Sequence, residues 1–295
     1  MAVLPLDVAV RCPDGDIPLC RLEDGPRPTR RRPPWYLEAL ILVWLGWAYD
    51  QISNFAPLRE NIAIGHGRDI IGLERVLKLD LEVPLDRWLS AHYSIGLWVS
   101  TYYDNAHFVV TFAVIGWLFW RHPEPYRSLR TSLVVVNLIG FVGFWLYPTA
   151  PPRLLPGYHI ADVVAATGAF GSSHSGDLAD HANELAAMPS LHLAWAAWSA
   201  LAVWRVLRPR RFAWVVFAYP LATTLAVLAT GNHYFLDVVA GIATLVLADV
   251  GARLLGRLGC RLPLPGRLKR RRAKLRLRAV NRAQPNPPLS RPAPS

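Results

Sequence analysis

Cysteine is scarce in this sequence, and its few copies are irregularly spaced. Only Cys12, Cys20 and Cys260 occur among the 295 residues. An odd number of cysteines without paired spacing predicts neither a disulfide framework nor a structural zinc site. We therefore expect a fold held together by packing, and a functional site that uses no metal and no cofactor.

Lysine is also rare, and no secretory leader is recognisable. The lysines are Lys78, Lys269 and Lys274, so the long stretch between the first two contains none. The first residues do not show a basic segment followed by an apolar core, so we expect no cleaved signal peptide. Targeting would then depend on the first apolar segment.

Apolar residues dominate the chain, although its charge is strongly positive. Hydrophobic residues make up 53% of the sequence, 12 residues are tryptophan, and the formal net charge is +11. The apolar residues gather in segments that each approach the ~20 residues needed to cross a bilayer. These segments are Trp35 to Phe55, Trp98 to Trp120, Leu129 to Tyr147, Met188 to Val206, Phe212 to Thr230 and Tyr234 to Leu255. The predicted fold class is all-α, a polytopic membrane helical bundle of about six transmembrane helices.

Two further features complete the expected membrane domain. Glu38 lies near the start of the first segment, where we expect its carboxylate to reach lipid headgroups. Between the first two segments, Ile70, Leu73 and Leu77 recur at helical spacing among charged residues. This pattern predicts an interfacial amphipathic helix that ends before Pro84, with Glu74 as one of its surface charges.

The composition changes at both ends and divides the chain into parts. Residues 1–33 are rich in proline and arginine and are expected to be a disordered basic N-terminal segment. Residues 34–256 form the predicted transmembrane domain, and residues 257–295 form a basic, proline-rich, disordered tail. Because the tail directly follows an apolar segment, we expect it to bind anionic lipids and not nucleic acid. The oligomeric state is left open.

The arginines between the apolar segments predict an orientation. They fall before the first segment, between the second and third, between the fourth and fifth, and in the tail, at Arg27 to Arg32, Arg121 to Arg130, Arg205 to Arg211 and Arg267 to Arg278. In a six-segment topology all these groups lie on one side of the bilayer, which the positive-inside tendency makes cytoplasmic. Both termini are then cytoplasmic, and the 148–187 loop is extracytoplasmic.

Two histidines and a carboxylate stand out at the extracytoplasmic ends of the predicted segments. Asp237 follows His233 by four residues, so the carboxylate can hydrogen-bond the imidazole if both are helical. Pro189 and Ser190 indicate a helix start, which places His192 in a first turn whose free N–H groups suit an anion. These features predict a phosphate site.

The residues named so far resemble the type 2 phosphatidic acid phosphatase superfamily, and within it the branch of inositol phosphorylceramide and sphingomyelin synthases. The resemblance is carried by Pro148-Thr149-Ala150-Pro151-Pro152-Arg153, by Pro189-Ser190-Leu191-His192, and by His233 with Asp237. It implies that His233 attacks phosphorus, Asp237 orients it, and His192 protonates the leaving alcohol. Arg153 would hold phosphate oxygens, together with the amides around Ser190 and Leu191.

The sequence departs from the phosphatase pattern in ways that bear on the substrate. The pattern has a lysine before its arginine, and a Ser-Arg pair before the nucleophilic histidine. Here that lysine is missing, and Ala226 and Val227 occupy the positions of the pair. Fewer cations weaken binding of a dianionic phosphomonoester more than binding of a phosphodiester, so we favour lipid headgroup transfer or a diester substrate.

Several alternatives stay open from the sequence. His107, Tyr103 and Asn232 are possible pocket residues, although an interfacial belt of aromatic and polar side chains also explains the first two. Histidines and aspartates in the 148–187 loop suggest a metal site, but their spacing favours a solvated loop; they are His159, His174, His181, Asp162, Asp177 and Asp180. A lipid phosphotransferase or phosphatase acting on phospholipid or polyprenyl-phosphate substrates is the preferred function. The alternatives are a membrane transporter and a non-catalytic scaffold.

Overall fold

The computed structural model describes residues 33–55, 59–168, 184–207, 211 and 213–261. Expectations for the N-terminal segment, for the tail after residue 261, and for His174, Asp177, Asp180 and His181 therefore lie outside the described residues. Within the described ranges the structure is helical, and an isolated bridge between Thr149 and Ala186 is the β-type pairing it shows. The predicted all-α class is confirmed.

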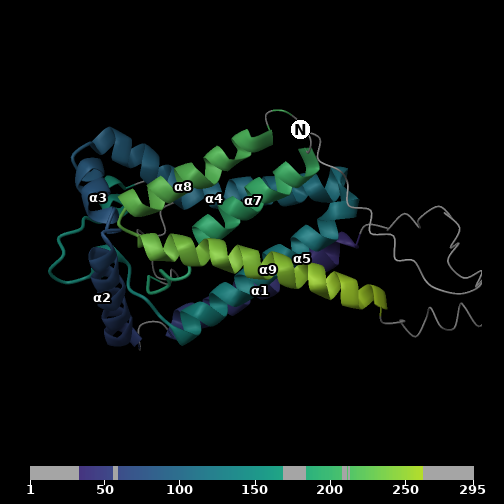
Figure 1. Ribbon diagram of the computed structural model, residues 1–295, viewed down its shortest axis with the longest axis horizontal. Coiled ribbons are helices and arrows are strands. Elements are labelled where there is room, and N and C mark those ends of the chain that lie inside the picture. Colours follow the sequence, from purple (N-terminus) through teal and green to yellow (C-terminus); the bar gives the residue numbers. More distant parts are fainter. Residues whose placement is uncertain (1–32, 56–58, 169–183, 208–210, 212, 262–295) are drawn as a thin grey trace, which may run out of the picture. The chain divides into compact units, whose positions relative to one another are not determined.

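Nine α-helices and two 3₁₀ helices make up the described part of the chain. They are α1 (Trp35–Phe55), α2 (Glu60–Leu77), α3 (Glu82–Ser90), α4 (Tyr93–Arg121), α5 (Pro123–Leu146), η2 (Pro152–Leu154), α6 (Val163–Thr167), α7 (Leu191–Leu207), η4 (Ala213–Phe217), α8 (Ala218–Ala229) and α9 (Phe235–Arg261). The long helices α4, α5, α7, α8 and α9 pack side by side, and α1 lies against α5 (Figure 1). At one end of these helices, α2 runs across them and contacts α9 and η2.

Two of the helices are long and apolar enough to cross a membrane. They are Pro123–Leu146 and Phe235–Leu255, while Trp35–Tyr49, Leu191–Leu207 and Ala213–Ala229 are shorter apolar helices. The expected segments all correspond to helices, and the first has the predicted bounds Trp35–Phe55. Helix length does not establish six spans, so that number stays a prediction.

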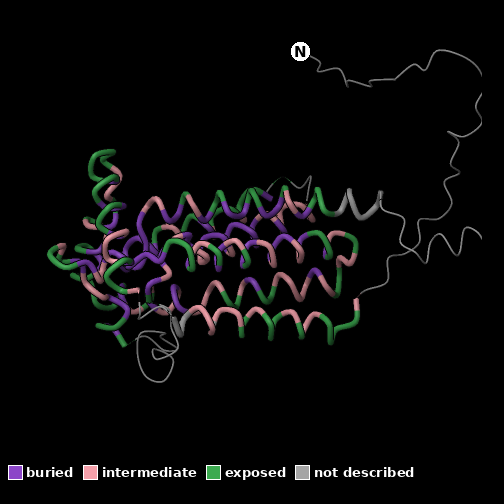
Figure 2. Tube along the Cα trace, turned by 90° about the horizontal axis from the view of Figure 1, so that it is seen from below, coloured by how far each residue is buried: buried purple, intermediate pink, exposed green. Residues whose placement is uncertain are grey.

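Large apolar side chains are exposed along the long helices. Trp98 of α4, Val43 of α1 and Leu247 of α9 are 76%, 69% and 63% exposed. Figure 2 shows exposed residues repeating along the helices, with buried residues between them. Contiguous apolar exposure of this kind marks a surface that contacts lipid or another protein. The arrangement supports the membrane association that the sequence predicts.

The buried core lies where α4, α5, α7 and α9 meet. Trp198 of α7 is fully buried, and its indole Nε1 donates to the carbonyl of Leu129 at 3.0 Å. Glu38 of α1 pairs with Arg130 of α5 at 3.2 Å and is 15% exposed. Its position at the headgroup level stays a prediction.

Helix α2 packs differently from the predicted surface helix. Ile70 is buried, but Leu73 and Leu77 are about half exposed, and Glu74 is fully buried. The expectation that Glu74 is a surface charge was wrong, because the packed face of α2 is turned toward α9 and brings this carboxyl inward. Helix α2 ends at Leu77, before Pro84 as predicted. Pro84 itself lies in the first turn of α3, where proline is tolerated.

Candidate active site

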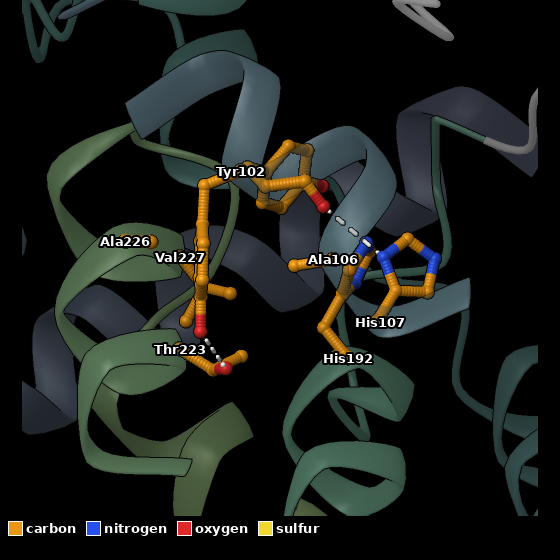
Figure 3. Close-up of a pocket in the computed structure, with 8 residues that line it drawn as sticks. Tyr102, Ala106, His107, His192, Thr223, Ala226 and Val227 are labelled. Carbon is orange, nitrogen blue, oxygen red and sulfur yellow. Dashed lines mark hydrogen bonds between the residues drawn. The ribbon is translucent and has the colours of Figure 1, made fainter. Parts of the chain in front are cut away.

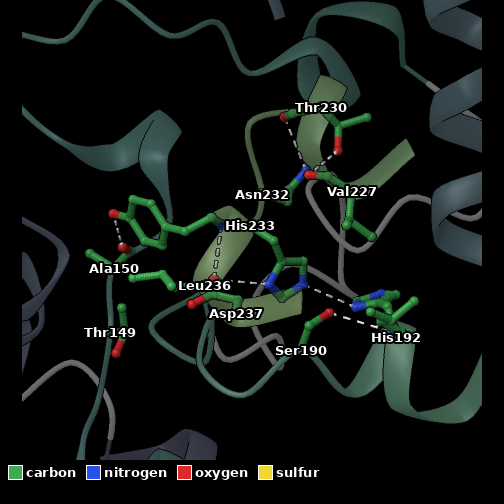
Figure 4. A network of polar contacts seen from close by, with 12 residues as sticks. Thr149, Ala150, Ser190, His192, Val227, Thr230, Asn232, His233, Leu236 and Asp237 are labelled. Atoms are coloured by element: carbon green, nitrogen blue, oxygen red, sulfur yellow. Dashed lines mark hydrogen bonds and ion pairs between the residues drawn. The ribbon is translucent and has the colours of Figure 1, made fainter. Parts of the chain in front are cut away.

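The start of α9 places an imidazole beside a buried carboxylate. His233 precedes the helix, so the two residues are not both helical as the sequence argument supposed. The Asp237 Oδ2 atom nevertheless lies 3.3 Å from His233 Nδ1 and accepts the Tyr234 N–H at 3.0 Å (Figure 4). Asp237 is fully buried and His233 is 3% exposed. Asp237 thus caps the helix and orients the imidazole at the same time.

A second imidazole faces the other nitrogen of His233. His192, in the first turn of α7, places its Nδ1 atom 3.3 Å from His233 Nε2. If Asp237 accepts the Nδ1–H of His233, the Nε2 atom of that ring carries a lone pair and accepts from His192. The chain Asp237, His233, His192 therefore presents the tautomer of His233 that a nucleophile needs.

Close backbone packing between α5, α7 and α9 fixes the position of His192. The Ser190 N–H donates to the Asp237 carbonyl at 3.2 Å, and a Cβ on Gly241 of α9 would lie 2.5 Å from the Ser190 carbonyl oxygen. A Cβ on Gly143 of α5 would lie 2.7 Å from Pro189 Cδ. Two helices therefore approach the start of α7 closely through glycine.

Ser190 and Leu191 begin α7 as predicted, but Ser190 contributes less to an anion site than expected. Its Oγ accepts the Leu193 N–H at 3.4 Å as a helix cap, and its own N–H is engaged by Asp237. Ser190 is fully buried. The amides of Leu191 and His192, which lack intrahelical acceptors at a helix N-terminus, are then the ones placed to receive an anion.

Arg153 lies in η2, next to the turn that leads to His233. Its N–H donates to the Gly231 carbonyl at 3.0 Å, and its Nε donates to Asn232 Oδ1 at 2.8 Å. Nη1 lies 3.1 Å from Asp162 and Nη2 lies 3.1 Å from Glu184, while the arginine side chain is only 4% exposed. Arg153 thus bonds the residue that directly precedes His233, and its guanidinium also pairs with two carboxylates that the sequence did not predict there.

The possible pocket residues His107 and Tyr103 of α4 also lie at the site. Their rings are 4.2 and 4.5 Å from the His192 ring, centroid to centroid. Together with residues of α8 they line a small pocket (Figure 3), whose walls are Tyr102, Tyr103, Ala106, His107, His192, Thr223, Ala226 and Val227. Ala226 and Val227, which stand where the phosphatase pattern has Ser-Arg, thus face this pocket with apolar side chains.

Buried carboxyls behind the nucleophile were missed from the sequence. Glu74 of α2 accepts the Leu236 N–H at 2.6 Å, so it helps to hold the first turn of α9. Glu82 of α3 is also fully buried and faces Glu74. Burial raises the pKa of both carboxyls, and their proximity to each other and to Asp237 adds to the shift of Glu74.

Two further features of the site concern metal ligands and the phenol beside His233. Within the part of the chain that the structure describes, there is no group of three or more His, Cys, Asp or Glu side chains arranged to hold a metal. Asp162, one of the loop aspartates, instead caps α6 by accepting the Ala165 N–H at 2.9 Å. Tyr234, fully buried, donates to the Ala150 carbonyl at 2.7 Å and ties the segment before Arg153 to the start of α9.

The sequence of the chain is similar to those of known proteins. Residues 68–250 match the family model of the PAP2 superfamily, a range that includes Arg153, His192, His233 and Asp237. The phosphoinositol dihydroceramide synthase of Bacteroides thetaiotaomicron is 28% identical over 144 residues, which cover 44% of this chain and 46% of that protein. The match thus spans about half of the relative's length, and no solved structure matches the chain. The chain belongs to the PAP2 superfamily.

Proposed function

We propose that this protein is an integral membrane lipid phosphotransferase or phosphatase that forms a phosphohistidine on His233. The observation that carries the proposal is the chain of contacts from Asp237 through His233 to His192. The family membership and the relative, which is named as a synthase of a phosphorylated lipid, support the class of reaction. The exposed apolar side chains support a bilayer setting.

The first step is an in-line displacement at phosphorus. His233 Nε2 attacks, a P–N bond forms, and the P–O bond to the leaving alcohol breaks. Asp237 stabilises the positive imidazole that results, and His192 gives its proton to the departing oxygen. Because His233 Nε2 and His192 Nδ1 are 3.3 Å apart, their hydrogen bond must open when the phosphoryl group enters between them.

The second step returns His233 to its starting state. An acceptor hydroxyl attacks phosphorus, His192 takes its proton, and the P–N bond breaks. Water as acceptor gives a phosphatase, and a lipid alcohol gives a phosphotransferase. The amides of Leu191 and His192 stabilise the equatorial oxygens, whose charge is greatest in the transition state. None of these steps requires a metal or a cofactor.

The positive-inside tendency supports an active site on the extracytoplasmic face, with both termini in the cytoplasm. In this orientation the starts of α7 and α9 and the η2 segment lie outside, and the α4–α5 and α7–α8 connections lie inside. Phospholipids or polyprenyl phosphates of the outer leaflet would reach the histidines directly. Labelling of single introduced cysteines by a membrane-impermeant reagent in intact cells tests this orientation.

A panel of phospholipids in detergent, with and without an acceptor alcohol, tests the enzymatic proposal. We expect His233→Ala to abolish turnover and His192→Ala to lower it by about 10²- to 10⁴-fold, the usual contribution of a general acid. With a good leaving group, only the His192 variant should still accumulate an acid-labile phosphoenzyme. His92→Ala is the matched control, because His92 is exposed and bonds the Trp88 carbonyl away from the site. Normal turnover by His233→Ala would refute the mechanism.

A further inference from the structure

The candidate phosphate ligand Arg153 is held by carboxylates. Its three guanidinium nitrogens each donate to a different side-chain oxygen, on Asn232, Asp162 and Glu184. Both acidic partners lie 3.1 Å from a guanidinium nitrogen. A guanidinium recognises phosphate and carboxylate oxygens with the same planar fork. The two carboxylates therefore use donors that a phosphoryl group would also use.

The charges of this group have a consequence for the substrate. Among the described residues of this group, one guanidinium and two carboxylates sum to one negative charge, and Ala226 and Val227, which line the pocket beside His192, carry no charge. A phosphomonoester carries close to two negative charges at neutral pH, because its second pKa is about 6. A phosphodiester carries one. Repulsion from Asp162 and Glu184 thus acts more strongly on the monoester.

We propose that Asp162 and Glu184 are specificity-determining residues that select phosphodiester over phosphomonoester substrates by their charge. This inference rests on the proposed function, since it assumes that Arg153 contacts the phosphoryl group. It assigns to the site a substrate class, a lipid whose phosphate is esterified on both sides. It also predicts that a product which is a phosphomonoester leaves readily.

The two carboxylates differ in how firmly they are held. Asp162 is 29% exposed and also caps α6 through the Ala165 N–H, so it stays in place when substrate binds. Glu184 is 46% exposed and bonds Nη2 alone among the described contacts of its side chain. Glu184 is thus the partner that a phosphate oxygen replaces on Arg153, and Asp162 is the fixed negative charge that remains.

Turnover of two lipids by the full-length protein in detergent tests the proposal. Phosphatidate serves as the monoester and phosphatidylglycerol as the diester, and kcat/KM is measured for each. The variants are Glu184→Gln, Asp162→Asn and the double variant, which keep the side-chain shape. Asparagine also keeps the cap on α6. Glu124→Gln is the matched control, because it removes the same charge from an exposed position in the first turn of α5.

We expect each substitution to raise the ratio of phosphatidate to phosphatidylglycerol turnover by about tenfold, the order expected for one unit charge near a protein surface. The control variant Glu124→Gln should change this ratio by less than twofold from the wild-type value. Below pH 6 the monoester loses a charge, so the turnover ratios of the wild type and the double variant should differ less there. A ratio that stays constant in the double variant, or equal losses with both lipids, would overturn the proposal. His233→Ala distinguishes a failure of this inference from a failure of the proposed function. If turnover is lost in His233→Ala while the lipid ratio stays constant in the double variant, only the role of Asp162 and Glu184 is refuted.

Discussion

Replacing Gly241 by alanine should separate the two catalytic histidines. Gly241 lies on the face of α9 that touches the start of α7, and the added Cβ would lie 2.5 Å from the Ser190 carbonyl oxygen and 3.6 Å from the Ala194 nitrogen. The Ser190 carbonyl oxygen belongs to the backbone, so the rotation of a side chain cannot relieve this contact. A carbon and an oxygen in ordinary contact are about 3.5 Å apart, which requires a shift of about 0.5 to 1 Å between the helices.

The structure indicates which contacts this shift would disturb. His192 lies two residues after Ser190, and its bond to His233 Nε2 spans the same gap between α7 and α9. Gly143 of α5 also packs closely on the start of α7, since a Cβ there would lie 2.7 Å from Pro189, so α7 has little room to move. A misplacement of about 1 Å between reacting groups costs about 10²-fold in rate. We expect kcat to fall by that factor and KM to change less.

Gly251→Ala is the matched control. It lies on the same helix, and nothing comes within 4 Å of its added Cβ. Alanine there should stabilise α9 by about 0.5–1 kcal/mol through helix propensity and leave turnover intact. The assay is steady-state kinetics on the preferred lipid, with a thermal melt in detergent for each variant. Wild-type kcat in a folded Gly241→Ala protein would refute the claim that this close approach sets the histidine geometry.

Two further predictions concern the carboxyls around the nucleophile. Burial raises the pKa of Glu74 and Glu82, so the folded state holds a proton that the unfolded chain releases near pH 4.5. The free energy of unfolding should therefore fall as pH rises from 5 to 9. In thermal melts across this pH range, Glu82→Gln should make that fall less steep. An unchanged slope would contradict a raised pKa of Glu82 in the folded state. Asp237→Asn should lower kcat by about 10⁴-fold, as in other orienting aspartates, because the amide favours the wrong tautomer of His233. Retained kcat in that variant, by the same lipid assay, would remove Asp237 from the mechanism.

Much of the site follows from the sequence because its residues lie close together in short motifs. His233 and Asp237 are near neighbours in the chain, so local geometry alone brings them together. Pro189 and Ser190 predict where α7 begins. That His192 meets His233, however, depends on α7 packing against α9, and the sequence argument reached it through a family resemblance and the ends of apolar segments.

The features of the site that the sequence does not predict are all long-range contacts. Asp162 and Glu184 approach Arg153 from two separate loop segments, and no spacing rule connects them. Glu74 was placed on a surface because helical periodicity assumes that charged residues face water. In a bundle whose outer face is itself apolar, the periodicity of apolar residues does not distinguish the lipid-facing side of a helix from its packed side. A buried carboxyl such as Glu74 can then accept a hydrogen bond from a helix N–H, here that of Leu236.

These missed contacts change how the site is expected to hold a phosphate. The family resemblance implies that Arg153 holds phosphate oxygens, but two carboxylates compensate the charge of its guanidinium in the structure. Attraction for the phosphoryl group then falls mainly to the amides at the start of α7 and to the proton on His192. Both are most effective when negative charge builds up in the transition state. Such a site stabilises the transition state more than it stabilises a highly charged bound substrate. This property suits an enzyme that transfers a headgroup between lipids.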